Sequence, residues 1–188
     1  LFDFLARQTE RVMVIPRIGA ITSMCTLVEC IVTRAADKLP SDETQLRKVL
    51  GKIMIFAASW AVAGVLEPSD REKYTAYMQD HAASFMPECG AGETVFEFAL
   101  SEETWNWEPW SPPQWQYPIK DEPLDFSNLL VPTMDSTRSI FLLHALNAMN
   151  RPTIMTGGSG TAKTSTALMF MAEFNNAHML SKRLNFSS

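Results

Sequence analysis

The sequence predicts a small α-helical subdomain followed by the start of a parallel α/β fold. Three observations support this prediction. Apolar residues recur at helical spacing up to about residue 86. A segment rich in tryptophan and proline then interrupts regular structure. Near the end, an apolar segment, a glycine-rich turn and a helical segment follow one another, which is the order in which a parallel α/β sheet begins.

Residues 1–86 are expected to form four short helices. The first helix is amphipathic only in part, and Pro16 interrupts it. The second helix is expected over residues 18–36, where apolar side chains recur every three or four positions. Pro40 then breaks the chain, and Ser41 is placed to cap the third helix.

The third and fourth helices complete this helical subdomain. The third carries a wide apolar stripe, which predicts burial against several neighbours. The stripe consists of Leu46, Val49, Leu50, Ile53, Met54, Ala57, Trp60, Ala61 and Gly64. Residues 69–72 follow Pro68 and have the spacing of a capping box, so they are expected to begin a fourth helix that runs toward Phe85.

Residues 87–131 are expected to be an extended connector with short strands. Residues 94–98 alternate between apolar and polar side chains, as a strand does. Residues 105–115 contain four tryptophans and three prolines. Proline excludes regular helix and tryptophan is costly to leave in water, so we predict that the tryptophans anchor the connector. The alternative is a groove for Pro-rich peptides or single-stranded nucleic acid, but the segment lacks the basic patch that nucleic acid requires.

Residues 132–188 are expected to begin a parallel α/β domain. Pro132 and Thr133 precede a helix with several apolar positions. A short strand is expected at residues 153–156, a helix at residues 163–174, and the next strand at residues 183–187.

The sequence GGSGTAKT, at residues 157–164, is a near match to the phosphate-binding pattern G-x-x-x-x-G-K-[ST]. Glycines let the backbone curl so that amide N–H groups face a polyphosphate, and the N-terminus of the following helix adds a positive dipole. Lys163 is expected to reach the β- and γ-phosphates, and the hydroxyl of Thr164 to ligate Mg²⁺. The predicted nucleotide contacts are Gly157, Gly158, Ser159, Gly160, Thr161, Ala162, Lys163 and Thr164.

Ala162 is the departure from this pattern, which has glycine at that position. The methyl group is acceptable if the backbone angle φ is negative, and it is a problem if φ must be positive. The alternative reading of the whole motif is a tight strand-to-helix turn that binds nothing.

The residues after the motif lack the machinery for hydrolysis. ATP hydrolysis needs an acidic residue at the end of a later strand, and Glu173, within the predicted helix, is the only acidic residue after Thr164. We therefore predict no catalytic residue in this chain, which should bind ATP or ADP with Mg²⁺ without hydrolysing ATP by itself. The three histidines are scattered, with no cysteine or carboxylate at metal-ligand spacing.

Composition argues against several other classes of protein. A net charge of −5 gives no reason to expect a surface that binds nucleic acid or anionic lipid. The longest apolar run, residues 53–66, is too short to span a bilayer. The three cysteines are irregularly spaced, which favours reduced thiols in an intracellular protein. The chain begins within a helical pattern and ends within a predicted strand, so we expect it to be part of a longer protein.

Four segments of the chain resemble dynein heavy chains. GSGTAKT, followed by a helix and LNFSS, is similar to the P-loop and next strand of a dynein AAA+ module. VPTMDSTR resembles the segment before the P-loop of the third module. KIMIFAASWAVAGVLEPSDREKY resembles the small helical subdomain of the second module, and WNWEPWSPPQWQYP resembles the crossing between the two modules. The resemblance covers nearly the whole chain in the right order.

This resemblance implies an α/β fold, the start of a P-loop AAA+ core, preceded by an α-helical AAA+ small subdomain. It assigns residues 1–86 to the small subdomain of the second module, residues 87–131 to the connector, and residues 132–188 to the start of the third large subdomain. It also implies that three residues contact the adenine, namely Val131, Pro132 and Thr133. Alanine before the P-loop lysine resembles axonemal dyneins, with the outer-arm type slightly favoured over the inner-arm type.

The whole protein would then be an ATP-dependent, minus-end-directed microtubule motor of the axoneme of cilia and flagella, and the site in this chain would be regulatory. Its implied partners are the neighbouring AAA+ modules, microtubules, and dynein intermediate and light chains, with no nucleic acid and no membrane. Two alternatives stay open. One is another AAA+ ATPase such as a minichromosome-maintenance-type helicase, which predicts basic DNA-contacting hairpins. The other is a structural AAA+ module with an empty P-loop.

Overall fold

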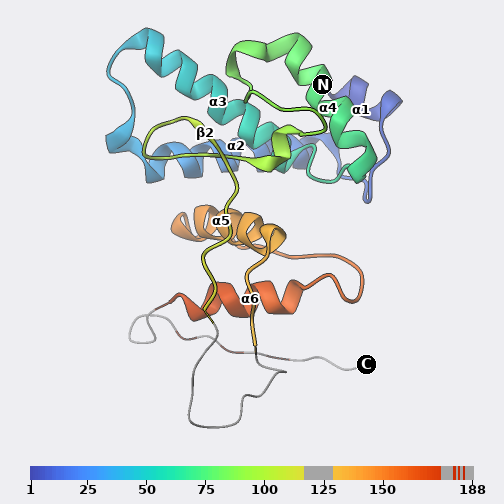
Figure 1. Cartoon of the computed structure of the whole chain (residues 1–188), viewed down its shortest axis with the longest axis vertical. Coiled ribbons are helices and arrows are strands. Elements are labelled where there is room, and N and C mark those ends of the chain that lie inside the picture. The colour runs from blue at the N-terminus through green and yellow to red at the C-terminus, as the bar shows by residue number, and fades with distance from the viewer. Residues whose placement is uncertain (117–128, 175–179, 181, 183, 185–188) are drawn as a thin grey trace. The chain divides into compact units, whose positions relative to one another are not determined.

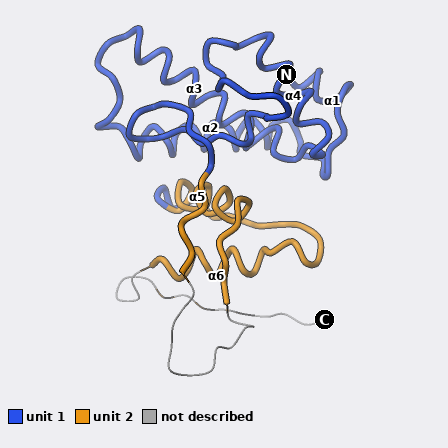
Figure 2. The backbone as a smooth tube through the Cα atoms, viewed as in Figure 1, with its two compact units in different colours: residues 1–110, 148–150 blue, residues 111–147, 151–188 orange. Residues whose placement is uncertain are grey.

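The computed structural model describes residues 1–116, 129–174, 180, 182 and 184. The chain divides into two compact units (Figures 1 and 2). The first unit comprises residues 1–110 and 148–150, and the second comprises residues 111–147 and 151–188.

The first unit is built mainly from four α-helices (Figure 1). They are α1 (Phe2–Gln8), α2 (Arg17–Arg34), α3 (Glu43–Ala61) and α4 (Pro68–Ala82). The short 3₁₀ helices η1 (Ala36–Lys38) and η2 (Ala83–Phe85) follow α2 and α4. The prediction of four helices in this part of the chain is confirmed.

Two predicted helix caps are wrong. Helix α3 begins at Glu43, so Asp42 and not Ser41 is its N-cap, and the Asp42 carboxylate accepts a hydrogen bond from the backbone N–H of Gln45 at 2.8 Å. Helix α4 begins one residue earlier than the predicted capping box, at Pro68. Proline suits a first helical position because its fixed φ is already helical and its missing N–H is not needed there.

Helix α1 is shorter than the amphipathic pattern suggested, and the chain beyond it pairs with the segment before α4. The backbone N–H of Val12 donates to the carbonyl of Val65 at 2.8 Å, and that of Glu67 donates to the carbonyl of Glu10 at 3.1 Å. The buried carboxylate of Asp70 accepts a hydrogen bond from the N–H of Glu10 at 2.5 Å, which lowers the pKa of Asp70.

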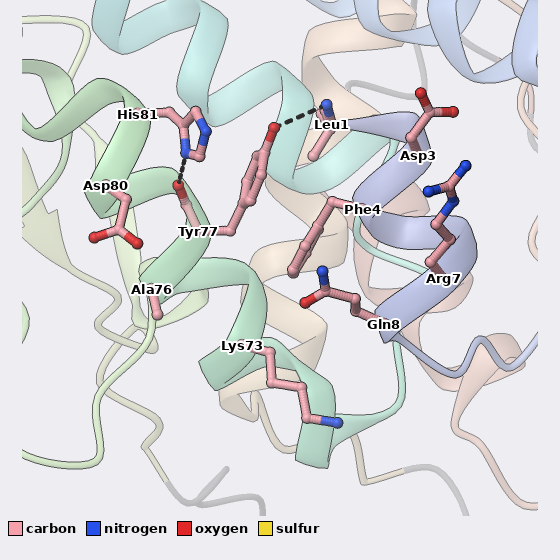
Figure 3. A pocket seen from close by; sticks show the side chains of 10 residues that line it. All are labelled: Leu1, Asp3, Phe4, Arg7, Gln8, Lys73, Ala76, Tyr77, Asp80 and His81. Carbon is pink, nitrogen blue, oxygen red and sulfur yellow. Dashed lines mark hydrogen bonds between the residues drawn. The ribbon is translucent and has the colours of Figure 1, made fainter.

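Helices α1 and α4 lie side by side and contact each other through aromatic rings (Figure 3). The ring of Tyr77 stacks on that of Phe4 with centroids 4.2 Å apart, and the ring of His81 stacks on Tyr77 at the same spacing. Stacked rings contribute beyond the area that they bury, so this contact fixes α1 against the rest of the unit.

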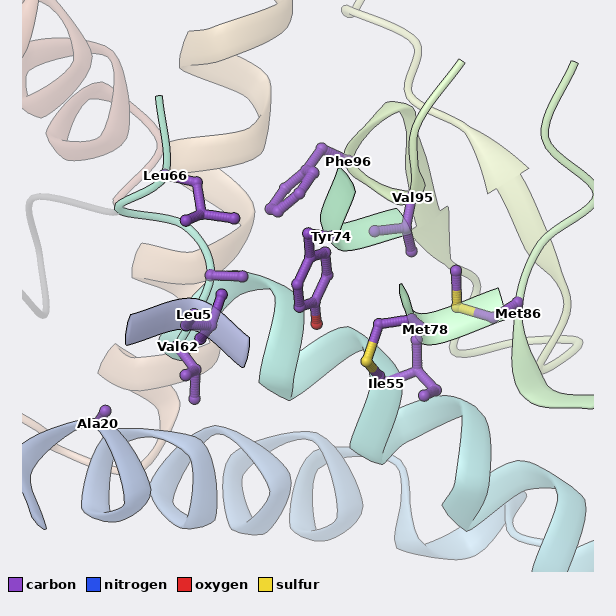
Figure 4. Packing of buried hydrophobic residues seen from close by; sticks show 11 residues of the cluster. Leu5, Ala20, Ile55, Val62, Leu66, Tyr74, Met78, Met86, Val95 and Phe96 are labelled. Carbon is purple, nitrogen blue, oxygen red and sulfur yellow. The ribbon is translucent and has the colours of Figure 1, made fainter. Parts of the chain in front are cut away.

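The core of the first unit brings together α3, α4 and the segment after α4 (Figure 4). Its largest fully buried side chains include Tyr74, Phe56 and Phe96. The stripe predicted for α3 is only partly correct, because Leu50 and Met54 are 37% and 44% exposed whereas Ile55 and Phe56 are buried. The buried face of α3 is therefore wider than the predicted stripe and includes the side that contacts these aromatic rings. The spacing of apolar residues alone does not predict this width.

The predicted strand at residues 94–98 is replaced in part by a turn. Residues Val95–Glu97 form the 3₁₀ helix η3, because the side chains of Thr94 and Glu97 cap it reciprocally. The strand that follows, β1 (Phe98–Leu100), pairs antiparallel with β2 (Trp107–Pro109), with Phe98 opposite Pro109.

The tryptophan-rich segment is extended and anchored, as predicted. Trp105 and Trp110 are 4% and 8% exposed. The indole N–H of Trp105 donates to the carbonyl of Lys38 at 2.9 Å, and that of Trp107 donates to the carbonyl of Phe85 at 2.8 Å. These three indoles belong to the packing of the first unit, which argues against the alternative of an aromatic groove. Trp115 belongs to the second unit.

Gly51 in α3 lies directly against the ring of Phe85. A Cβ atom at Gly51 would lie 2.3 Å from Cδ1 of Phe85, closer than nonbonded carbons approach. Gly51→Ala is therefore expected to lower the free energy of unfolding by about 1–3 kcal/mol. At Gly19 in α2 the nearest atom to a new Cβ is 3.7 Å away, so Gly19→Ala should instead stabilise the chain by up to about 1 kcal/mol. Urea unfolding of the two variants measures the contrast, and equal shifts in the same direction would contradict it.

The second unit contains helices α5 (Met134–Ala148) and α6 (Lys163–Ala172). Thr133 and Ser136 exchange hydrogen bonds at the start of α5, where the N–H of Ser136 donates to the Thr133 hydroxyl at 3.2 Å. Residues 153–156, predicted to be a strand, are not part of a strand in the structure, and Ile154 is 86% exposed. A strand requires a paired partner, and the next predicted strand, residues 183–187, lies outside the described residues except for Leu184.

Within the described ranges, no helix has the length and apolar character needed to cross a lipid bilayer.

Candidate functional site

The glycine-rich loop leads directly into α6. The loop is bent, with a turn at Ser159 and Gly160, and α6 begins at Lys163. Gly160 has φ +77°, a left-handed conformation that glycine adopts without steric cost. The helix N-terminus therefore lies at the end of a sharply curved backbone segment, which is the local geometry that favours anions.

Ala162 also has a left-handed conformation, with φ +55° and ψ +15°. An L-residue pays a steric cost in this region because its Cβ approaches the following carbonyl oxygen. The structure therefore meets the unfavourable condition for Ala162, which is that its φ is positive. The strict pattern has glycine at this position, and the backbone angle explains why.

The side chain of Lys163 folds back onto the loop. Its ammonium donates hydrogen bonds to the carbonyl oxygen of Gly158 at 2.5 Å and to the hydroxyl of Thr161 at 3.0 Å. The Thr161 hydroxyl donates in turn to the same carbonyl of Gly158 at 2.9 Å. A neutral carbonyl is a weaker partner for an ammonium than a phosphate oxygen, because hydrogen bonds between two charged groups are the stronger ones.

Lys163 and Thr164 line one hollow of about 390 Å³. Its other lining residues are Met155, Ala167, Leu168, Met171, Lys182 and Leu184. Thr164 is exposed, and its hydroxyl has no hydrogen bond to a described residue, so it is accessible to a metal ion. Lys182 brings a second cation to this hollow. It was not predicted, since an isolated lysine far along the chain gives no signal in the sequence.

The three residues expected to contact adenine have different environments. Val131 is 50% exposed. Pro132 lines a second hollow of about 330 Å³, mostly apolar, whose walls include Ile140 and Met169. The hydroxyl of Thr133 takes part in the cap of α5. The phosphate loop is not among the residues that line this second hollow, so the structure does not join the two predicted parts of the nucleotide site in one pocket.

Glu173, the only acidic residue after the loop, lies at the other end of α6 and is paired. Its carboxylate lies 2.6 Å from Nε2 of His144. The ten residues of α6 separate it from Lys163, which corresponds to roughly 15 Å along the helix axis. Glu173 is therefore too far from Lys163 to polarise a water molecule that attacks a phosphate group bound by Lys163. No cluster of three or more His, Cys, Asp or Glu residues in the described ranges could hold a metal ion.

A groove between α1 and α4 lies in the first unit (Figure 3). It contains Asp3 and Lys73, but these pair with Arg17 and Asp70 at 2.6 Å each. The stack of Phe4, Tyr77 and His81 forms another part of its wall. This arrangement places no nucleophile beside a base.

Replacing Ala162 by glycine tests the cost of its left-handed backbone. Ala162→Gly is expected to stabilise the start of α6 by about 0.5–1 kcal/mol, since the steric cost of the methyl group exceeds the extra flexibility of glycine. Ala167→Gly, in the interior of α6, should destabilise the helix by a similar amount. Amide hydrogen exchange in α6 measures both changes, and a loss of protection in both variants would contradict the expected difference in sign.

Two family models match the chain. "Dynein heavy chain AAA lid domain" matches residues 1–112, and "P-loop containing dynein motor region" matches residues 117–188. The first match ends at Pro112, close to Trp110, which ends the long N-terminal segment of the first unit.

Individual proteins are also similar to this chain. The dynein gamma chain of the flagellar outer arm from Chlamydomonas reinhardtii is 30% identical over 139 residues, which cover 73% of this chain and 3% of that protein. Human dynein axonemal heavy chain 8 is 32% identical over 144 residues, 74% of this chain and 3% of that protein. The dynein-1-alpha heavy chain of the flagellar inner arm I1 complex from Chlamydomonas reinhardtii is 26% identical over 198 residues, 98% of this chain and 4% of that protein. The chain thus spans only a few per cent of the length of these relatives.

Proposed function

The chain belongs to the dynein heavy-chain family of axonemal type, and from that premise we propose that it contributes a nucleotide-binding AAA+ site to a ciliary microtubule motor. The observation that supports this most is the start of α6, where Lys163 and Thr164 follow a curved glycine-rich loop and line the same hollow. A cation, an accessible hydroxyl and a helix N-terminus together suit a polyphosphate with its magnesium ion.

The proposed ligand is ATP or ADP with Mg²⁺. On binding, the Lys163 ammonium would exchange the carbonyl of Gly158 and the hydroxyl of Thr161 for phosphate oxygens. This exchange replaces neutral acceptors by charged ones and is therefore favourable. The Thr164 hydroxyl would ligate Mg²⁺, and the backbone of residues 157–162 would surround the phosphates.

The adenine is proposed to lie against residues 131–133. The apolar hollow beside Pro132 supports this placement, because a purine ring prefers a site with apolar walls. Pro132 and Ile140 would supply those walls. For this placement the apolar hollow and the phosphate loop must form one continuous site in the complete module.

The whole protein is proposed to be an ATP-dependent, minus-end-directed microtubule motor of the axoneme, in which this site is regulatory. Residues 1–86 would belong to the small subdomain of the second AAA+ module and residues 132–188 to the large subdomain of the third, joined by residues 87–131. The neighbouring modules, microtubules, and dynein intermediate and light chains would be its partners. No acidic residue is among the described residues that line the hollow of Lys163, so hydrolysis at this site would require other residues.

One observation favours a second candidate, a structural AAA+ module whose P-loop stays empty. Lys163 is already satisfied by the loop itself, so the motif is stable without an anion. The helicase alternative is not favoured, because both family models that match are those of dynein.

Titration with a fluorescent ADP analogue separates the two candidates. Saturable binding in the presence of Mg²⁺, weakened when the metal is chelated, is the result expected for a nucleotide site. Phosphate release from ATP should stay at the background rate, because the described walls of the hollow beside the loop contain no acidic residue. Absence of saturable binding at millimolar nucleotide would favour the structural candidate.

A further inference from the structure

A groove on the first unit lies between α4 and the segment that follows η2. It has a volume of about 850 Å³, within the range of sites that hold ligands or peptide side chains. Its floor includes the apolar side chains of Met86 and Pro87, both buried, and its rim includes exposed glutamates. The groove is therefore amphipathic, and it is independent of the phosphate loop, which lies in the second unit.

Three glutamates line this groove, and no lysine or arginine does. They are Glu72 from α4 and Glu88 and Glu93 from the following segment. None of the three has an ion-pair partner among the described residues, whereas exposed acids elsewhere in the unit, such as Asp3 and Glu43, pair with arginines. The negative charge of the groove is therefore not compensated within the described part of the chain.

The loop that presents Glu93 is held in one conformation. Its carboxylate accepts a hydrogen bond from the N–H of Gly90 at 2.8 Å, and its own N–H donates to the carbonyl of Gly90 at 3.1 Å. Gly92 has φ +79°, which suits the tight turn between them. A binding surface that is already ordered loses less conformational entropy when a partner binds.

Cys89 lies in the same groove and reports on its electrostatics. Burial raises the pKa of the Cys89 thiol, and the negative charges of Glu93 and Glu97 raise it further. The groove is thus a place where an added negative charge is unfavourable and an added positive charge is favourable.

We propose that this groove binds an amphipathic, lysine- or arginine-bearing peptide segment of another polypeptide. The apolar floor would contact the aliphatic stems and apolar side chains of the segment, and the three glutamates would pair with its cationic groups. A metal ion is a poorer occupant, because no group of acids within the described ranges is close enough to coordinate one. A small polyamine would use the charges and leave the apolar floor unused.

The test is fluorescence anisotropy with a labelled helical peptide, roughly 15 residues long, in which lysine and leucine occupy opposite faces. The triple variant Glu72→Gln, Glu88→Gln and Glu93→Gln should bind about tenfold more weakly. A control variant with the same change in net charge is Asp37→Asn, Asp80→Asn and Glu108→Gln, which alters exposed acids outside the groove. It should bind within about twofold of the unmodified chain.

Protection of Cys89 locates the peptide directly. In a Cys25→Ser chain, Cys89 is the only thiol that is not fully buried, and the peptide should slow its alkylation. Spermine should protect it less at equal charge concentration. The proposal is overturned if the unmodified chain does not bind the peptide, if both triple variants lose affinity equally, if bound peptide leaves alkylation unchanged, or if spermine protects as well as the peptide.

Discussion

Replacing Phe96 by alanine is expected to lower the free energy of unfolding of the first unit by about 3–5 kcal/mol. The ring is fully buried. It contacts the rings of Trp60 and Tyr74 at centroid distances of 5.5 and 5.7 Å, and the guanidinium of Arg71 lies 4.8 Å from its centroid. Truncation would therefore remove one ring from an aromatic cluster and leave a cavity that these large neighbours cannot refill.

Urea unfolding followed by far-ultraviolet circular dichroism measures this loss, since α1 to α4, most of the helices in the described residues, belong to the first unit. A total stability of 5–15 kcal/mol is typical of proteins, so about a fifth or more of it would disappear. Trp115→Ala is the matched control, because Trp115 is 37% exposed and lies in the second unit. A change below about 1 kcal/mol for Phe96→Ala would show that the cluster repacks around the gap.

Replacing Lys163 by alanine is expected to weaken the binding of Mg²⁺–ADP at least about 30-fold, from the loss of roughly 2 kcal/mol or more when one partner of a close charge pair is removed. The reason is that Lys163, at the first position of α6, is the positively charged side chain at the end of the glycine-rich loop and is proposed to contact the phosphates. The same substitution also removes the hydrogen bonds to Gly158 and Thr161. Circular dichroism is therefore needed to show that α6 is retained.

Two further lysine variants serve as controls for the loss of a positive charge. Lys48→Ala makes the same change in charge on the exposed surface of the first unit and should leave the affinity unchanged. Lys182→Ala removes the second cation of the same hollow and should have a smaller effect, because Lys182 lies outside the loop. Equal affinities of the unmodified chain and the Lys163→Ala variant for Mg²⁺–ADP would contradict the proposed role of the loop in nucleotide binding.

Helical periodicity predicted the helices of the first unit well, because amphipathic helices owe their stability to the packing that the pattern reflects. The errors lie at helix ends and in short strands. Ser41 and Asp42 are both good caps, and only the register of α3 selects Asp42. Residues 94–98 alternate like a strand, yet the reciprocal bonds between Thr94 and Glu97 stabilise a turn over most of them.

For the candidate site, the sequence revealed the residues but not their conformations. The motif identified Lys163 and Thr164, which the structure places on one hollow. The left-handed backbone of Ala162 and the bonds of Lys163 to Gly158 depend on local geometry that a pattern leaves open. The sequence did not predict the groove lined by Glu72, Glu88 and Glu93. Glu72 is separated from the other two along the sequence, and the three come together only because α4 packs against a later loop.

The uneven placement of the tryptophans has an optical consequence. Of the five tryptophans in the chain, four (Trp60, Trp105, Trp107 and Trp110) lie in the first unit, and Trp115 alone lies in the second. Ultraviolet emission of the chain therefore comes mainly from the helical unit, and a loosening of α6 and its loop would leave most of the spectrum unchanged. In a chain in which only Trp115 is retained, with the other four replaced by phenylalanine, the emission would instead come from the second unit, which contains the glycine-rich loop.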